Sequence, residues 1–179
     1  DALVAGQALL ATGQSEDAGK KFDLVLQQEQ AAADRMRQAF AGKAQIALDA
    51  ARYEEALDYF QKAAALVDKT AAPLAWAHAQ HGVAFVLDKL ARHKEAEPLM
   101  REVVRIREEK LGPDDPKLAT ALNNLASLLQ ATNRLSEAEP LMRRALRIDE
   151  ASLGPDHPDV ATDLNNLALL LKATNRLSE

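Results

Sequence analysis

The chain alternates between apolar stripes at helical spacing and short polar turns. Leu122, Leu125, Leu128 and Leu129 follow an i, i+3, i+6, i+7 pattern, which places them on one face of a helix. A polar turn at 132–134 separates them from a second stripe. The apolar positions of this second stripe are Leu141, Met142, Ala145, Leu146 and Ile148. The pattern predicts two amphipathic helices joined by a tight turn.

The same helix–turn–helix pattern extends over the whole chain. Glycine and proline residues interrupt it at 112–116 and again at 154–158. We predict helices at 1–12 and 16–28, 33–50 and 53–68, 72–90 and 94–110, 117–131 and 135–152, and 159–173. Because no segment carries a strand signal, the predicted fold class is all-α.

An internal repeat of 42 residues accounts for this organisation. Residues 111–137 and 153–179 are identical at 21 of 27 aligned positions. The segment RLSEAEPLM at 134–142 also matches RHKEAEPLM at 92–100, and weaker copies lie nearer the N-terminus. The recurring alanines are Ala18, Ala56, Ala96 and Ala138. Because each helix pair can bury its inner face only against its neighbours, we predict an α-solenoid.

We interpret the whole chain, 1–179, as one array of five units. The units span approximately 1–30, 31–70, 71–112, 113–154 and 155–179. The next recurring alanine would fall at position 180, one residue beyond the sequence. We therefore expect the last unit to be truncated.

Composition and charge narrow the classes of function. The 179 residues carry a formal net charge of −5, from 22 basic and 27 acidic residues that are interspersed. The absence of a basic tract argues against nucleic-acid binding. No apolar run approaches the ~18 residues that span a bilayer, and no signal peptide is visible. We therefore expect no membrane partner and a cytoplasmic location.

No motif supports an enzyme or a metal site. The chain has no cysteine, no glycine-rich phosphate loop and no nucleophile–base motif. His78 and His81 form an H-x-x-H pair on one helix face, but the sequence positions no third ligand to complete a metal site. We predict no catalytic activity, no cofactor and no metal, and we assign the two histidines to the lining of a groove or to a solvated face.

Charged residues of both signs alternate on the second helix of each pair. They are Arg101, Glu102, Arg105, Glu108, Arg143, Arg144, Arg147, Asp149 and Glu150. This mixture is typical of a solvated face with modest pairing between residues one turn apart. We predict that these side chains form the outer surface of the solenoid.

The repeated residues resemble the tetratricopeptide repeat, which places small and large apolar residues at fixed positions of two helices. In the fourth unit these positions are Leu122, Leu125, Ala126, Leu129, Ala138, Met142 and Ala145. The 42-residue period, the loop LGPDHPDVA and the phrase LNNLA are similar to the kinesin-light-chain type of this repeat. The resemblance implies a right-handed superhelix of antiparallel helix pairs. It also implies a protein-interaction scaffold that binds an extended peptide or a helix in its concave groove.

In this repeat type the first helix of each pair lines the concave side, so its polar positions outside the packing face are candidate ligand contacts. The candidates are Thr120, Asn123, Asn124, Ser127 and Gln130, with Thr162, Asn165, Asn166 and Lys172 one unit later and His78 and His81 one unit earlier. A side-chain amide both donates and accepts hydrogen bonds, so it can bind the backbone of an extended peptide of any sequence. Alternatively, the two Asn pairs bond within or between helices and order their packing.

Two other functions are compatible with a solenoid. The chain could be the regulatory or sensor arm of a larger protein whose catalytic domain lies elsewhere. It could also be an assembly module that stacks end to end with a second copy, because a repeat face without a capping helix is apolar.

Overall fold

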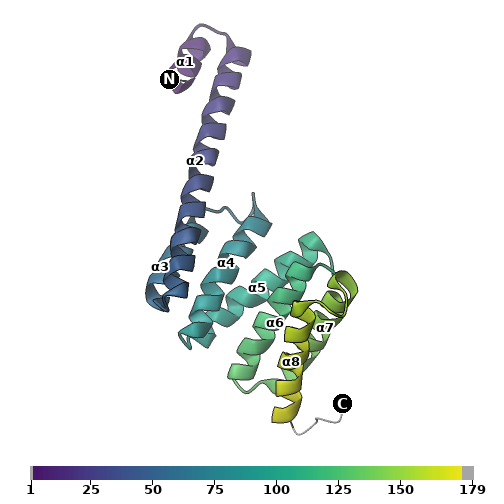
Figure 1. Ribbon diagram of the computed structural model, residues 1–179. Coiled ribbons are helices and arrows are strands. Elements are labelled where there is room, and N and C mark those ends of the chain that lie inside the picture. Colours follow the sequence, from purple (N-terminus) through teal and green to yellow (C-terminus); the bar gives the residue numbers. More distant parts are fainter. Residues whose placement is uncertain (1, 175–179) are drawn as a thin grey trace.

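The computed structural model describes residues 2–174 as helices joined by short turns (Figure 1). The helices are α1 (Ala2–Ala11), α2 (Ser15–Asp49), α3 (Tyr53–Ala65), α4 (Pro73–Lys89), α5 (His93–Leu111), α6 (Pro116–Ala131), α7 (Leu135–Leu153) and α8 (Pro158–Ala173). The prediction of an all-α fold built from packed helix pairs is confirmed. Position 1 and positions 175–179, which belong to the first and last predicted units, lie outside the described residues. The division into five units stays a prediction.

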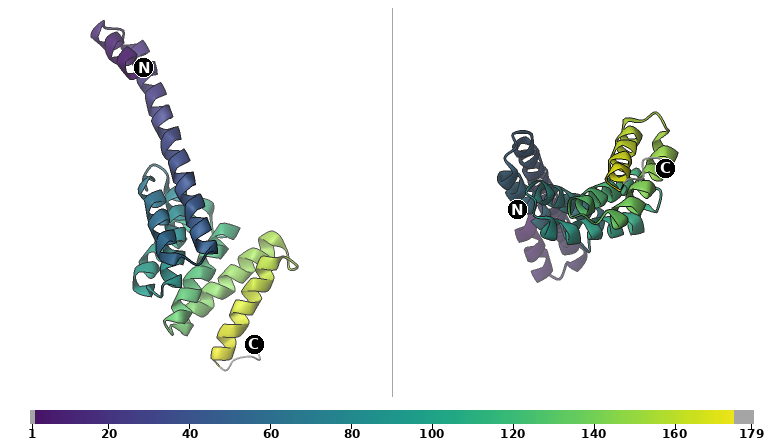
Figure 2. Two further views of the ribbon diagram at one scale, coloured as in Figure 1. Left: turned by 60° about the vertical axis from the view of Figure 1, so that its left-hand side comes forward. Right: turned by 90° about the horizontal axis from the view of Figure 1, so that it is seen from below.

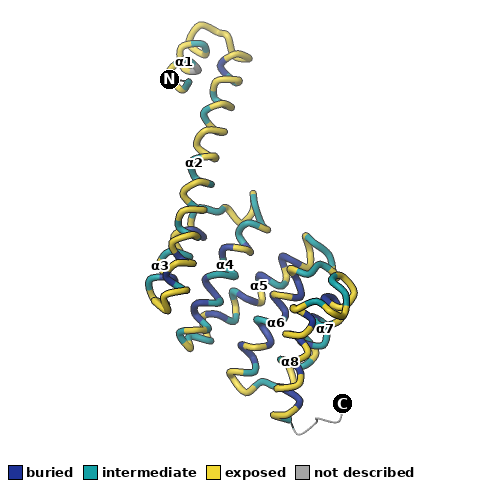
Figure 3. Tube along the Cα trace, in the orientation of Figure 1, coloured by how far each residue is buried: buried dark blue, intermediate teal, exposed yellow. Residues whose placement is uncertain are grey.

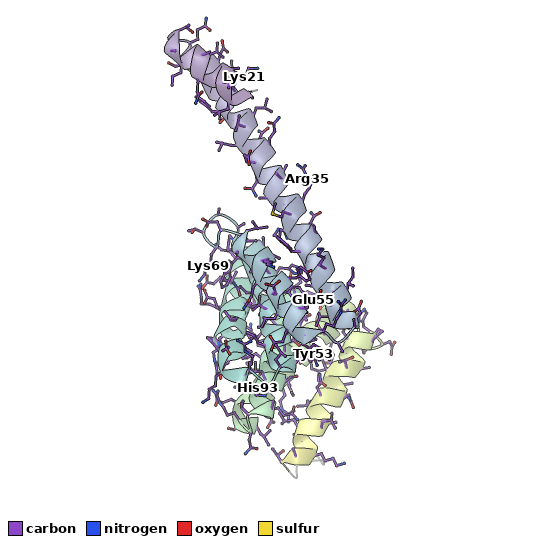
Figure 4. The ribbon with its side chains drawn as sticks, turned by 90° about the vertical axis from the view of Figure 1, so that its left-hand side faces the viewer. Lys21, Arg35, Tyr53, Glu55, Lys69 and His93 are labelled. Atoms are coloured by element: carbon purple, nitrogen blue, oxygen red, sulfur yellow. The ribbon has the colours of Figure 1, made fainter. Side chains whose placement is uncertain are left out.

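The N-terminal region departs from the predicted helix map. α2 is one continuous helix of 35 residues, so the predicted break between 28 and 33 is wrong. The sequence at 29–33 is EQAAA, which consists of strong helix formers and contains neither glycine nor proline. The N-terminal part of α2 packs only against α1 and extends away from the other helices, with most of its side chains exposed (Figure 3). Lys21 and Arg35 point outward from α2 (Figure 4).

The turns inside successive helix pairs share one geometry. Ala51, Ala91 and Asn133 each adopt a left-handed backbone conformation, with φ of 54°, 56° and 60°. The following N–H then bonds a carbonyl five residues back, as in the 2.8 Å bond from Arg134 N to Leu129 O. This arrangement satisfies carbonyls that the helix end would leave without partners. Of the three residues, only Asn133 is of a type that favours this conformation.

Each recurring alanine is buried at the contact between the two helices of a pair. The exposed fractions are 1% for Ala18 and 0% for Ala56, Ala96 and Ala138. A small side chain at this position lets two helices approach closely. Larger apolar side chains fill the space between pairs and join most helices in a continuous core, which is dense from α4 to α7 and absent from the extended half of α2 (Figure 3).

The helices from α4 to α8 form two layers of a curved stack. Besides helices that follow one another in the chain, the contacts among residues 2–174 join α4 to α6 and α6 to α8. The inner layer of a curved stack has the shorter radius, so its helices are the ones that touch. α4, α6 and α8 therefore line the concave side, and α5 and α7 lie outside; Figure 2 shows the arc from below, with α8 inside α7. In the described part of the chain, no helix is long and apolar enough to cross a membrane.

Candidate functional site

A polar cavity of about 310 Å3 opens on the concave side between α6, α7 and α8. Six of the candidate residues line it: Thr120, Asn123, Asn124, Ser127, Thr162 and Asn166. They come from the two copies of the repeat that are most alike in sequence. The structure therefore brings together, in one cavity, polar side chains that lie about 42 positions apart.

The other candidates lie outside this cavity. Asn165 and Lys172 are exposed on α8, and Gln130 is half-buried near the end of α6. His78 lines a separate cavity of about 220 Å3 beside Arg37 of α2. His81 lies between these regions and reaches the polar cavity only through its contact with Asn124.

The Asn pair on α6 links three neighbouring inner helices. Asn123 Nδ2 donates to Asp163 Oδ1 on α8. On the other side, Asn124 Nδ2 lies 2.6 Å from His81 Nε2 on α4. These contacts are what the packing interpretation of the Asn pair expects. Each bond uses the amide nitrogen, and neither uses the amide oxygen.

The bond to His81 depends on the charge of its ring. Burial, with smaller contributions from Arg107 and His78, lowers the pKa of His81 to about 4. The ring is therefore neutral near pH 7. Because Asn124 Nδ2 can only donate, Nε2 accepts and the ring proton is on Nδ1.

Three charged side chains are buried near the concave side, and sequence reasoning missed all of them. Arg107 is 7% exposed, Asp149 4% and Asp163 2%. The prediction that Asp149 lies on the solvated outer face is wrong, because it lines the polar cavity. Arg107 and Asp149 are 42 positions apart, at the same place in α5 and α7. An amphipathic helix with charges on most of its turns gives no signal that one of them points inward.

The charge of the concave side changes sign along the solenoid. Near α4, the side chain of Arg107 donates from Nη1 to Lys117 O at 2.6 Å. Burial lowers the pKa of His78, and the charges of Arg107, Arg37 and Lys117 lower it further. Near α8, the cavity contains three carboxyl groups instead. They are Asp149, Asp159 and Asp163.

The carboxyl groups of the cavity are held in an unfavourable environment. The pKa of Asp163 is raised to about 6, mainly by burial and further by Asp149 and Asp159, while the bond from Asn123 opposes the shift. Burial, together with Asp159, also raises the pKa of Asp149. Within residues 2–174, no group of three or more histidine and acidic side chains is placed to hold a metal ion.

Comparison with protein families matches residues 77–151 and 137–179 to the tetratricopeptide repeat. No curated protein matches the chain. Solved structures with the same fold include BtubC (BKLC) from P. vanneervenii, with 18% identity and a TM-score of 0.74 over 99% of this chain and 73% of that chain. A putative kinesin light chain from Podosopora anserina with nearly identical TPR-like repeats has 20% identity and a TM-score of 0.64 over 98% and 86% of the two chains. YrrB, a TPR protein with an unusual peptide-binding site, has 19% identity and a TM-score of 0.55 over 98% and 77%.

Proposed function

Because the chain belongs to the tetratricopeptide repeat family, we propose that it is a non-catalytic scaffold that holds an extended peptide segment of a partner protein in its concave groove. Domains of this family generally mediate protein or peptide binding and are typically non-catalytic, and no catalytic family matches the chain. The observation that carries the proposal is the polar cavity on the concave side, lined by amides and hydroxyls from successive inner helices.

The amide oxygen of Asn123 supports this function. Asn123 and Asn124 use their nitrogens to bind neighbouring helices, which fixes the orientation of both side chains. Asn123 Oδ1 is buried and has no hydrogen-bond partner among residues 2–174. An oxygen held in this way is an acceptor for a peptide N–H, and its rigidity reduces the entropy that binding costs. The packing role and the ligand role of the Asn pair are therefore compatible.

The spacing of the inner helices also suits an extended ligand. Packed helices lie ~8–10 Å apart, and an extended peptide rises ~3.3 Å per residue. Groups on α6 and α8 would then meet the peptide about every third residue. A rigid groove of this kind selects for backbone conformation first and for side chains second.

A peptide library displayed on phage tests the proposal, with Asn166→Ala as the diagnostic variant. Asn166 lines the cavity, and no hydrogen bond of its side chain is formed within the described residues. Loss of the Asn166 side chain should weaken the binding of selected peptides by about tenfold, as expected for one buried hydrogen bond. The thermal stability of the chain should not change. Asn165→Ala, on the same helix but outside the cavity, is the matched control and should retain affinity. Failure to select any peptide that the groove variant weakens would reject the function.

A second candidate function is end-to-end self-association through α8. Leu164 on α8 is 49% exposed, and no described helix covers it. The residue equivalent to Leu164 in α6, Leu122, is 1% exposed because α7 packs against it. We propose that a second copy could cover this face. Light scattering over a concentration series should then show dimers that Leu164→Glu abolishes; a monomer at all concentrations would exclude this function.

A further inference from the structure

The polar cavity between α6, α7 and α8, called the acidic cavity from here on, contains buried oxygens that have no hydrogen-bond partner within residues 2–174. They are Asn123 Oδ1, Asp149 Oδ1 and Asp163 Oδ2. All three are acceptors, and they come from three different helices. Buried polar atoms in folded proteins almost always have a partner, and leaving one without costs free energy. Asp149 and Asp163 also lie within hydrogen-bonding reach of each other, so a shared proton can satisfy part of this demand, and a ligand that donates several hydrogen bonds would satisfy the rest.

No basic side chain of residues 2–174 forms an ion pair with the buried carboxyl groups of the acidic cavity. Neither Asp149 nor Asp163 forms an ion pair within residues 2–174. The charged groups that act on the two carboxyls are mainly each other and Asp159, which lines the same cavity. His157 lies beside Asp159, with Nδ1 3.7 Å from Asp159 Oδ2, rather than inside the cavity. Two buried carboxylates without a counter-ion are costly, and a bound cation would offset that cost.

The acidic character is specific to the α7–α8 end of the solenoid. Asp159 stands where the preceding unit has Lys117, Asp163 where it has Ala121, and Asp149 replaces an arginine at the equivalent position. Six positions differ between residues 111–137 and 153–179, and two of them introduce these carboxylates. The repeat framework does not require acidic residues here, since the neighbouring unit folds in the same way without them.

We propose that the acidic cavity binds the cationic end of an arginine or lysine side chain carried by the partner segment. This inference rests on the proposed function and names the chemistry of one ligand residue. A guanidinium group presents several N–H donors in a planar fork, which suits carboxylate oxygens that approach from different helices. A metal ion fits less well, because no group of three ligating side chains in the described residues has the placement that it needs. The basic region near Arg107 repels the same side chain, so the cation is directed to the α8 end of the groove.

The test uses two small probes that differ in charge. The first is acetyl-Gly-Arg-Gly-amide, and the second replaces arginine with citrulline, which has nearly the same shape and no charge. Each is titrated into the 15N-labelled chain, and the side-chain amide signals of Asn123, Asn124 and Asn166 are followed by NMR. The arginine probe should give saturable shifts, and the citrulline probe should bind about tenfold more weakly or not at all.

Substitutions then locate the site. Asp149→Asn combined with Asp163→Asn should abolish the response to arginine, because it removes both buried charges and keeps the side-chain shape. Asp156→Asn makes the same change of charge on an exposed residue of the loop before α8 and should leave the response intact. If the double variant does not fold, the comparison of the arginine and citrulline probes in the unaltered chain still shows whether binding depends on the positive charge.

Three results would overturn the inference: equal binding of the two probes, no shift with arginine, or an equal response to magnesium chloride alone. The phage selection described above is independent of this test. If it yields groove-binding peptides without a basic residue, the proposed function stands and the inference is wrong. If the arginine probe binds but no peptide is selected, the cation site stands and the partner-segment function is wrong.

Discussion

The two copies of the LNNLA phrase form equivalent parts of α6 and α8, yet their surroundings differ. Leu122 is 1% exposed, while its equivalent Leu164 is 49% exposed. α6 has a helix on each side and contacts α4 and α8 on the concave side. α8 packs against α7 and α6, and no other described helix covers it. The comparison teaches that how much a residue of a solenoid contributes to stability depends on the neighbouring helices as much as on its own helix.

The polar positions show the same contrast. Asn123 and Asn124 both bond side chains of neighbouring helices. Asn165 and Asn166 have the same sequence context, but no side-chain hydrogen bond of either is formed within residues 2–174. In α6 the pair therefore helps to order the helices. In α8 the pair is left available, and Asn166 faces the acidic cavity.

The largest effect should come from truncating the two equivalent leucines. Leu122→Ala removes a side chain buried against Leu118 and Ile148 and leaves a cavity, so the free energy of unfolding should fall by about 2–5 kcal/mol. Leu164→Ala should cost less than about 1 kcal/mol, because half of that side chain is already in water. Urea unfolding followed by circular dichroism measures both. Equal losses would mean that α8 is covered in solution, as self-association would require.

The sequence predicted the buried positions of the repeat but not the length of α2. The burial of Leu122 and of the recurring alanines could be predicted, because the apolar pattern repeats in every unit and each unit packs in the same way. The 35-residue length of α2 could not, since a break was inferred from the repeat although the residues at 29–33 favour a helix. Local propensity prevailed over the repeat pattern there.

The candidate site could be predicted only in part. The cavity contains six of the predicted residues, because helical phase alone places them on the concave side. The burial of Asp149 and Asp163 could not be predicted, since it depends on which side chains face each other across different units. Aligning the two copies shows that a lysine and an alanine are replaced by carboxylates. This difference between the two copies was the signal that could have pointed to an acidic site on α8.

The second prediction is a pH dependence of stability that comes from α8 alone, because α6 has an alanine at the position equivalent to Asp163. The pKa of Asp163 is raised to about 6, against ~3.9 for an unfolded aspartate. The folded chain therefore binds this proton more tightly than the unfolded chain. The contribution of Asp163 to stability is largest below about pH 4 and is lost as the pH rises through about 6.

Asp163→Asn should remove this dependence. Relative to the unaltered chain, the variant should gain about 1.4 kcal/mol in unfolding free energy between pH 5 and pH 7.5. Urea unfolding at the two pH values measures the difference. Asp156→Asn, which changes an exposed carboxyl group, should show no such gain. A gain of the same size in both variants would assign the effect to net charge instead.

The third prediction separates the two Asn pairs. Asn123→Ala removes the donor to Asp163 Oδ1 and leaves a buried carboxylate with one partner fewer. The free energy of unfolding should fall by about 1–2 kcal/mol. Asn165→Ala removes the equivalent side chain from an exposed position and should change stability by less than about 0.5 kcal/mol. If both changes are neutral, the bond from Asn123 does not order the helices.

The smallest effect on stability is expected at a position where α6 and α8 carry different residues that are equally exposed. Ser127 and its equivalent Leu169 are both exposed. Ser127→Leu should raise the free energy of unfolding by about 0.3 kcal/mol, because leucine is the better helix former. The same change should weaken peptides chosen by phage selection, since Ser127 lines the acidic cavity and a larger side chain would narrow it. Ser127→Ala, which improves helix propensity without filling the cavity, should keep their affinity. A stability loss above about 1 kcal/mol for Ser127→Leu would mean that this side of α6 is packed and that the groove is closed to a peptide.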